Sequence, residues 1–216
     1  MPEFLKQNAT AILALLGVVV GSLLTGGFAL WKDWILRNRD FDLKVWERFL
    51  DRRMTAHEAV LDVAIKMRVM VSSGKVETPG EISRAPQLMM SKEAFHDWLF
   101  DFAEKSGTAT TWLSTPVKRE LNFVQDYFVT LNTHLSEAPS ERFAAEGSFI
   151  RQDFIDLSSA LEIKAFEYFK AEARELRLNN LTEHHKYPLA ETKRRLQKTV
   201  LLARLAEIKS IIGSTS

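Results

Sequence analysis

Between Ala9 and Trp31 the chain carries no charged side chain, and this feature constrains its fold more than any other. A helix of about 23 residues rises roughly 34 Å, which exceeds the roughly 30 Å hydrocarbon core of a bilayer. In lipid the helix is the one favourable conformation for a single segment, because it satisfies its own backbone hydrogen bonds. Trp31 and Trp34 follow at the far end, where indole rings favour the membrane–water interface. The sequence therefore predicts a transmembrane helix over residues 9–31.

A cleaved signal peptide is the alternative interpretation of the same segment. Its apolar core would be about 7–15 residues long, with a basic stretch before it and a small-x-small cleavage site after it. Here the apolar core is longer, Glu3 accompanies Lys6 in the leading segment, and no good Ala-x-Ala site follows. We therefore expect an uncleaved anchor.

The basic residues on either side of the span predict its orientation. Lys6 precedes the span, whereas the residues that follow it closely include Lys32, Arg37, Arg39, Lys44 and Arg48. The positive-inside rule counts Lys and Arg and largely ignores neighbouring Asp. It makes residues 1–8 a short extracytoplasmic tail and places the large C-terminal part in the cytoplasm. The predicted location is a cell membrane of the bacterial inner-membrane type, crossed once.

Small residues on one face of the predicted span form a candidate contact surface. Gly17 and Gly21 match Gly-x-x-x-Gly, and Thr25 continues the spacing. Small side chains let two helix backbones approach closely, so these residues favour a homodimer or a higher oligomer. The alternative is a chance match, because glycine is common in transmembrane helices.

The composition of the remaining chain favours an all-α fold. Only 9 Gly and 6 Pro occur in 216 residues, and no segment alternates convincingly between polar and apolar residues. We expect a cytoplasmic antiparallel bundle of four to five helices after the span. The absence of cysteine excludes disulfides, thiolate metal sites and cysteine nucleophiles.

Apolar spacing and capping residues divide the cytoplasmic part. Residues 32–73 form a membrane-proximal amphipathic helix, and residues 74–90 form a loop or hinge because they include glycines and prolines. Residues 91–216 make up the rest of the bundle. Its helices are expected from Ser91, from Ser114 or Thr115, from about Ser148 to Arg177, and from Pro188 to about Ile212. The clearest heptad-like spacing joins Val117, Leu121, Val124, Phe128, Leu131 and Leu135.

Three histidine patterns are candidate metal or switch sites. Glu93 and His96 match Glu-x-x-His, but no second copy completes a two-metal site. His184 and His185 are adjacent in a predicted loop, where neighbouring side chains rarely point the same way. His57 lies within an apolar stripe, which predicts a hydrogen-bonded histidine at a helix interface, with a pH switch as the alternative. The sequence indicates no metal, no cofactor and no catalytic residue.

The last predicted helix is basic through Lys193, Arg194, Arg195 and Lys198, whereas the segment 91–147 is acidic. Docking of these opposite charges within the bundle is the first interpretation. Contact with anionic lipid headgroups or with a partner is the second. Nucleic acid is the third, and it is disfavoured because aromatic residues are not interleaved with the basic ones.

These observations predict a membrane-anchored helical interaction or regulatory module that is not an enzyme. Its expected partners are the lipid bilayer, a protein, and further copies of itself. One alternative is a membrane-perturbing effector or regulator that oligomerises through its transmembrane helix. The other is an enzyme whose site in the bundle the spacing does not reveal.

Overall fold

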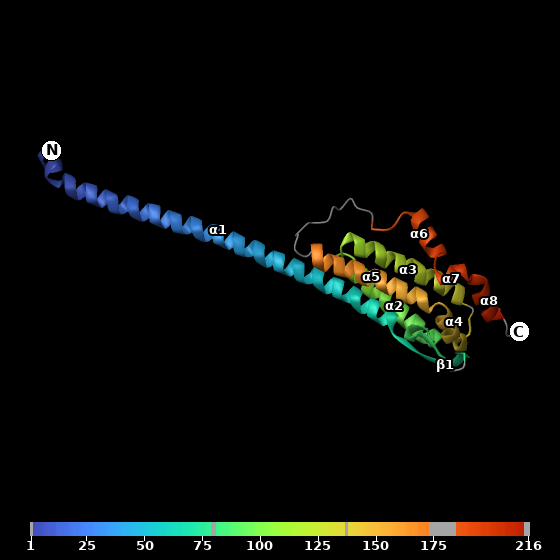
Figure 1. The fold of residues 1–216 in the computed structure, drawn as a ribbon. Coiled ribbons are helices and arrows are strands. Elements are labelled where there is room, and N and C mark those ends of the chain that lie inside the picture. Colours follow the sequence, from blue (N-terminus) through green and yellow to red (C-terminus); the bar gives the residue numbers. More distant parts are fainter. Residues whose placement is uncertain (1, 79–80, 137, 173–184, 214–216) are drawn as a thin grey trace. The chain divides into compact units, whose positions relative to one another are not determined.

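The computed structural model describes residues 2–78, 81–136, 138–172 and 185–213 (Figure 1). The chain divides into two units, Met1–Asp51 and Arg52–Ser216. Unit 1 consists of the first part of α1 (Pro2–Arg68), and the last turns of α1 belong to unit 2. The described residues are mostly helical, as the sequence predicts.

Unit 2 is a helical bundle with one β-hairpin. After α1 its elements are β1 (Met70–Thr78), β2 (Glu81–Pro86), the 3₁₀ helix η1 (Gln87–Met89), α2 (Lys92–Ala109), α3 (Thr115–Leu135), the 3₁₀ helix η2 (Ser140–Arg142), α4 (Phe143–Phe149), α5 (Arg151–Glu167), the π-helix η3 (Tyr168–Glu172), α6 (Leu189–Gln197), α7 (Val200–Ala203) and α8 (Leu205–Gly213). Within the bundle α5 packs along α3 (Figure 1).

The starts of α2 and α3 follow the capping signals of the sequence. The Ser91 hydroxyl accepts a hydrogen bond from the Ala94 N–H at 3.1 Å, which satisfies one of the free amides at the start of α2. Pro116 lies in the first turn of α3, where its missing N–H costs nothing. The six residues of the heptad-like spacing in α3 are all buried, so that prediction is confirmed.

An aromatic cluster centred on Phe128 of α3 forms the middle of the core. Its ring centroid lies 4.6 Å from that of Trp98 in α2 and 5.4 Å from that of Phe154 in α5. Edge-to-face pairs of this kind add about 0.5–1.5 kcal/mol to the stabilisation from burial alone. The cluster therefore ties three helices together at one point.

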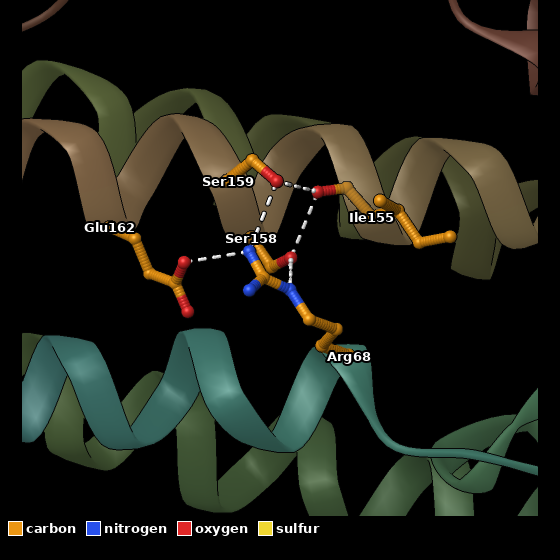
Figure 2. A network of polar contacts seen from close by, with 5 residues as sticks. All are labelled: Arg68, Ile155, Ser158, Ser159 and Glu162. Atoms are coloured by element: carbon orange, nitrogen blue, oxygen red, sulfur yellow. Dashed lines mark hydrogen bonds and ion pairs between the residues drawn. The ribbon is translucent and has the colours of Figure 1, made fainter.

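Arg68, the last residue of α1, fastens this helix to α5 (Figure 2). Its Nε donates to Ser158 Oγ at 3.2 Å, and its Nη2 donates to Ser159 Oγ at 3.0 Å and to Glu162 Oε2 at 2.7 Å. Both serine hydroxyls also donate to the carbonyl of Ile155, which fixes their orientation toward the guanidinium. The planar guanidinium presents its donors in a rigid fork that reaches these acceptors together, whereas a lysine ammonium is a compact point charge on a flexible stem.

The prediction of a loop over residues 74–90 is wrong, because most of this segment is a β-hairpin. Strands β1 and β2 pair antiparallel, and η1 follows them, so a hairpin occupies most of this segment. The inward positions of β2 are the small residues Ser83 and Ala85, whereas Arg84 is exposed. Small inward residues give a weak alternation signal, so the sequence pattern does not reveal the strand period. The hinge role of the segment stays a prediction.

The C-terminal helices are also more divided than the spacing predicts. The helix expected from Ser148 begins at Arg151 instead, because the backbone leaves helical geometry at Ile150 (φ −101°, ψ 11°). The helix expected after Pro188 is broken into α6, α7 and α8. Thr199 restarts the chain as α7, since its hydroxyl accepts from the Leu202 N–H. The predicted end of that first helix at Arg177 lies outside the described residues.

Candidate functional site

Gly17, Gly21 and Thr25 lie on unit 1, and nothing in that unit covers them. A Cβ built on either glycine meets no atom within 4 Å. The Thr25 hydroxyl donates to the Gly21 carbonyl at 2.8 Å, and the Ser22 hydroxyl donates to the Val19 carbonyl at 2.9 Å. The hydroxyls of Ser22 and Thr25 are thus satisfied by the backbone of their own helix, which suits a helix in hydrocarbon. Their contact with another helix stays a prediction.

The large apolar side chains of α1 are exposed along the predicted span. Between Leu13 and Trp31 their exposed fractions run from 45 to 74 %. The helix is long and apolar enough to cross a membrane, a property that signal sequences and core helices of soluble proteins share. A core helix buries its apolar residues within its own protein, and the described part of α1 does not bury these. A helix that is apolar all round must be covered by lipid or by other chains.

The four predicted basic contact residues separate into two groups in the structure. Lys193, Arg194 and Lys198 are exposed, and none of them has an ion-pair partner among the described residues. Arg195 instead turns inward from α6 to the buried carboxylate of Glu120 in α3. Docking of a basic helix residue onto the acidic segment is therefore observed for Arg195, and a surface role remains a prediction for the other three.

Glu120, Tyr187 and Arg195 form a compact cluster in which Glu120 is buried and the other two side chains are partly buried. Tyr187 Oη donates to Glu120 Oε2 at 2.9 Å, and Arg195 donates to both carboxylate oxygens. The guanidinium carbon of Arg195 also lies 3.8 Å from the Phe123 ring centroid. Burial raises the pKa of Tyr187, and the adjacent Glu120 charge raises it further. The cluster neutralises a buried charge and fastens α6 to α3.

Asp153 of α5 holds the start of α7 in the same part of the bundle. Its carboxylate accepts from the backbone N–H of Val200 at 2.7 Å and of Leu201 at 2.9 Å, and from Tyr127 Oη at 3.0 Å. Burial raises the pKa of Asp153, although these three donors work in the opposite direction. Because both oxygens are already engaged, this carboxylate stabilises structure and is not poised to abstract a proton from a substrate.

A groove of about 210 Å³ lies beside Asp153. Its lining comes from α3, α5 and the α6–α7 region: Phe123, Asp153, Asp156, Leu157, Ala160, Arg195, Lys198 and Thr199. This volume is below the roughly 300–1,000 Å³ of typical ligand pockets. Both acidic and basic side chains line the groove. Asp153 and Arg195 are already engaged in hydrogen bonds within the bundle. The groove presents no nucleophile with an adjacent base.

His57 of α1 is a buried, neutral histidine. The Ser114 N–H donates to its Nε2 at 3.2 Å, so Nδ1 carries the proton and donates to the Arg53 carbonyl at 2.7 Å. Its ring stacks on Tyr168, with centroids 3.6 Å apart. Burial, aided by the charges of Arg53 and Lys118, lowers the pKa of His57 to about 4. The prediction of a hydrogen-bonded histidine at a helix interface is confirmed.

In the other two histidine patterns, the described side chains do not share a common partner. Glu93 Oε2 accepts from Ser140 Oγ at 3.0 Å, whereas His96 Nε2 lies 3.2 Å from Asn132 Oδ1 on α3. His185 is exposed, and His184 lies outside the described residues. Within the ranges that the structure describes, no three His, Cys, Asp or Glu side chains come together in a group that could hold a metal ion.

The buried carboxylates are the residues that sequence reasoning missed. Glu120, Glu146 and Asp153 are each less than 5 % exposed. A signal existed for Glu120, because it lies three residues after Val117 and four before Val124 on the buried side of α3.

Comparison of the chain with models of protein families, with curated proteins and with solved structures finds no match.

Proposed function

We propose that the chain is a membrane-anchored helical interaction module. Residues 9–31 cross the membrane once, residues 1–8 stay outside, and the bundle of unit 2 binds a protein partner in the cytoplasm. The observation that carries the proposal is the exposure of the apolar side chains of α1 from Leu13 to Trp31. Leaving a Leu or Val side chain in water instead of burying it costs about 1.5–3 kcal/mol. Lipid removes this cost along the whole segment.

The buried polar groups of unit 2 support an interaction role over a catalytic one. His57, Glu120 and Asp153 each bond to groups of neighbouring helices and hold the bundle together. The exposed Lys193 and Arg194 of α6, with Lys198 at its C-cap, supply positive charge that the described part of the bundle leaves unpaired. Such charge suits an acidic partner surface or anionic lipid headgroups.

The absence of cysteine makes a direct test of anchoring and orientation feasible. Single variants Gln7→Cys and Glu104→Cys would be labelled with a membrane-impermeant maleimide, first in intact spheroplasts and then after lysis. We expect Gln7→Cys to react in both cases and Glu104→Cys to react only after lysis. Release of the chain from membranes by alkaline carbonate would refute anchoring, and the reverse labelling pattern would refute the orientation.

The interaction role is tested separately in native membranes. The triple variant Lys193→Gln, Arg194→Gln, Lys198→Gln is crosslinked beside the unchanged chain, with Lys170→Gln as an exposed control on the π-helix. We expect a crosslinked protein band that weakens only in the triple variant. No crosslinked partner in either chain would remove the basis for an interaction module.

A further inference from the structure

An uncharged line of side chains continues along α1 beyond the predicted span. Trp31, Trp34, Asn38, Phe41 and Val45 follow one another at alternating steps of three and four residues. This is the heptad spacing at which the core residues of two supercoiled helices meet. Every other line with the same spacing over residues 31–45 includes at least one charged residue. The spacing therefore identifies one face of the helix.

The structure leaves this face uncovered within unit 1. Trp34 is 61 % exposed, Phe41 is 67 % exposed and Val45 is 49 % exposed. These residues follow the span on the side that the proposed orientation places in the cytoplasm, so lipid tails do not cover them. Exposed aromatic and aliphatic side chains in a row are typical of an interaction surface.

We propose that this line is the contact seam of a parallel, in-register dimer of two copies of this chain. The parallel alignment rests on the proposed anchoring, because two copies inserted in the same membrane run in the same direction. Asn38 then meets Asn38 of the second copy within an otherwise apolar seam. A single buried asparagine pair favours one register and the two-stranded state, at some cost in stability.

Charge complementarity beside the seam favours a second copy as the occupant. With Trp31, Asn38 and Val45 at the first core position of each heptad, Arg37 and Asp42 occupy the two flanking positions. In a parallel dimer Arg37 of one helix faces Asp42 of the other, twice by symmetry. Neither residue has an ion-pair partner among the described residues. Lys44, the next flanking cation, faces the uncharged Phe49, so the pairing carries no like-charge contact there.

The same spacing runs back through the span along Leu13, Gly17, Val20, Leu24 and Gly27. The two glycines let the helices approach closely where lipid surrounds them. This line diverges from the Gly17–Gly21–Thr25 face, because Gly21 and Thr25 lie off it. The two faces therefore predict different contacts in the region beyond the membrane.

A cysteine scan of the full chain in membranes tests the seam. Each residue from Trp34 to Val45 is replaced singly by cysteine in the cysteine-free chain, and disulfide formation is measured under mild oxidation. We expect maxima at positions 34, 38, 41 and 45 and minima at Leu36, Asp40 and Leu43. Absent crosslinks, or maxima at 36, 40 and 43, would overturn the proposal.

Flotation of the same variants with membranes separates this proposal from the proposed function. A chain that floats with membranes without crosslinking overturns the dimer and leaves the anchoring intact. A chain that crosslinks at the seam positions without floating supports the dimer and overturns the anchoring.

Charge reversal gives a second, independent test on a Val45→Cys background. Arg37→Asp and Asp42→Arg each create two like-charge contacts, so each is expected to lower the dimerisation constant by about tenfold. The double variant restores opposite charges across the seam and should restore crosslinking. Failure of the double variant to recover would overturn the pairing. Gly21→Ile should leave the crosslink unchanged. Loss of the crosslink in this variant would assign the contact to the Gly17–Gly21–Thr25 face instead.

Discussion

Glu146 of α4 is the least satisfied charged side chain in the described bundle. It is 1 % exposed, and neither carboxylate oxygen has a hydrogen-bond partner among the described residues. Burial raises the pKa of Glu146 to about 7, while the Arg142 charge works in the opposite direction. An unpaired carboxylate at such a position destabilises the fold whenever it is ionised.

Glu146→Gln is therefore expected to stabilise the protein in a pH-dependent way. The folded-state pKa lies above the ordinary value of 4.5, so the fold is fully favoured below that value and loses stability as pH rises toward 7. The variant should gain about 1–3 kcal/mol at about pH 8 and little at about pH 4. Urea unfolding in detergent across this range measures the gain. The exposed Glu104→Gln serves as control, and an unchanged pH slope in Glu146→Gln would contradict the prediction.

His57 has the opposite pH dependence. Burial lowers its pKa from 6.5 to about 4, so its contribution is fully present above 6.5 and is lost as pH falls toward 4. His57→Phe keeps a ring against Tyr168 but leaves the Ser114 N–H without its acceptor, at a cost of about 1–3 kcal/mol near neutral pH. The difference between the variant and the unchanged chain should shrink on acidification. His185→Phe is the exposed control, and a constant difference from about pH 7 to about pH 4 would argue against a neutral His57.

At the scale of elements, two glycines in helices differ in the space around them. A Cβ on Gly147 of α4 would lie 2.6 Å from Met89 Cβ in η1, whereas a Cβ on Gly107 of α2 meets nothing within 4 Å. Gly147→Ala should therefore destabilise the bundle by about 1–3 kcal/mol through overpacking. Gly107→Ala should stabilise it by up to about 1 kcal/mol, because alanine is the better helix former. Thermal unfolding of the two variants compares them, and equal shifts would contradict the close approach of α4 to η1.

The elements that the sequence predicts well are those whose signals are local. Ser91, Pro116 and the heptad-like spacing of α3 each act within one helix, and the structure confirms them. The hairpin depends instead on pairing between Val71 and Ala85 and on packing of β2 against α4, which no local pattern carries. The break before α7 depends on Asp153, which lies 47 residues from Val200 in the chain. Such long-range contacts override the helical periodicity of the last segment.

At the scale of the whole molecule, the buried apolar residues belong to unit 2. Among the described residues, each one of the hydrophobic core lies between Ala56 and Ile208. A fragment of residues 52–216 is therefore expected to stay soluble and to unfold cooperatively, since it keeps the complete described core. Circular dichroism during urea titration tests this, with the full chain in detergent as reference. A fragment without a cooperative transition would show that unit 1 is needed for folding.

The candidate site could be predicted only in part, because some of its contacts join residues that are far apart in the chain. The exposed span is evident from an uninterrupted apolar stretch, and the exposed basic residues of α6 are evident from composition. The cluster of Glu120, Tyr187 and Arg195 joins Glu120 to residues that lie 67 and 75 positions away in the chain. Sequence spacing within a helix does not reveal which charged residue turns inward, because the choice depends on where the partner helix lies.

From the capping of α7 by Asp153 we also expect an order of events during folding. With four residues, α7 is too short to form alone in water, since helix nucleation is unfavourable. Its first amides are held by a carboxylate of α5 that Tyr127 of α3 also engages, so we expect α3 and α5 to pack before α7 forms. The amides of Val200 and Leu201 should thus gain protection from hydrogen exchange last, and they report completion of the bundle.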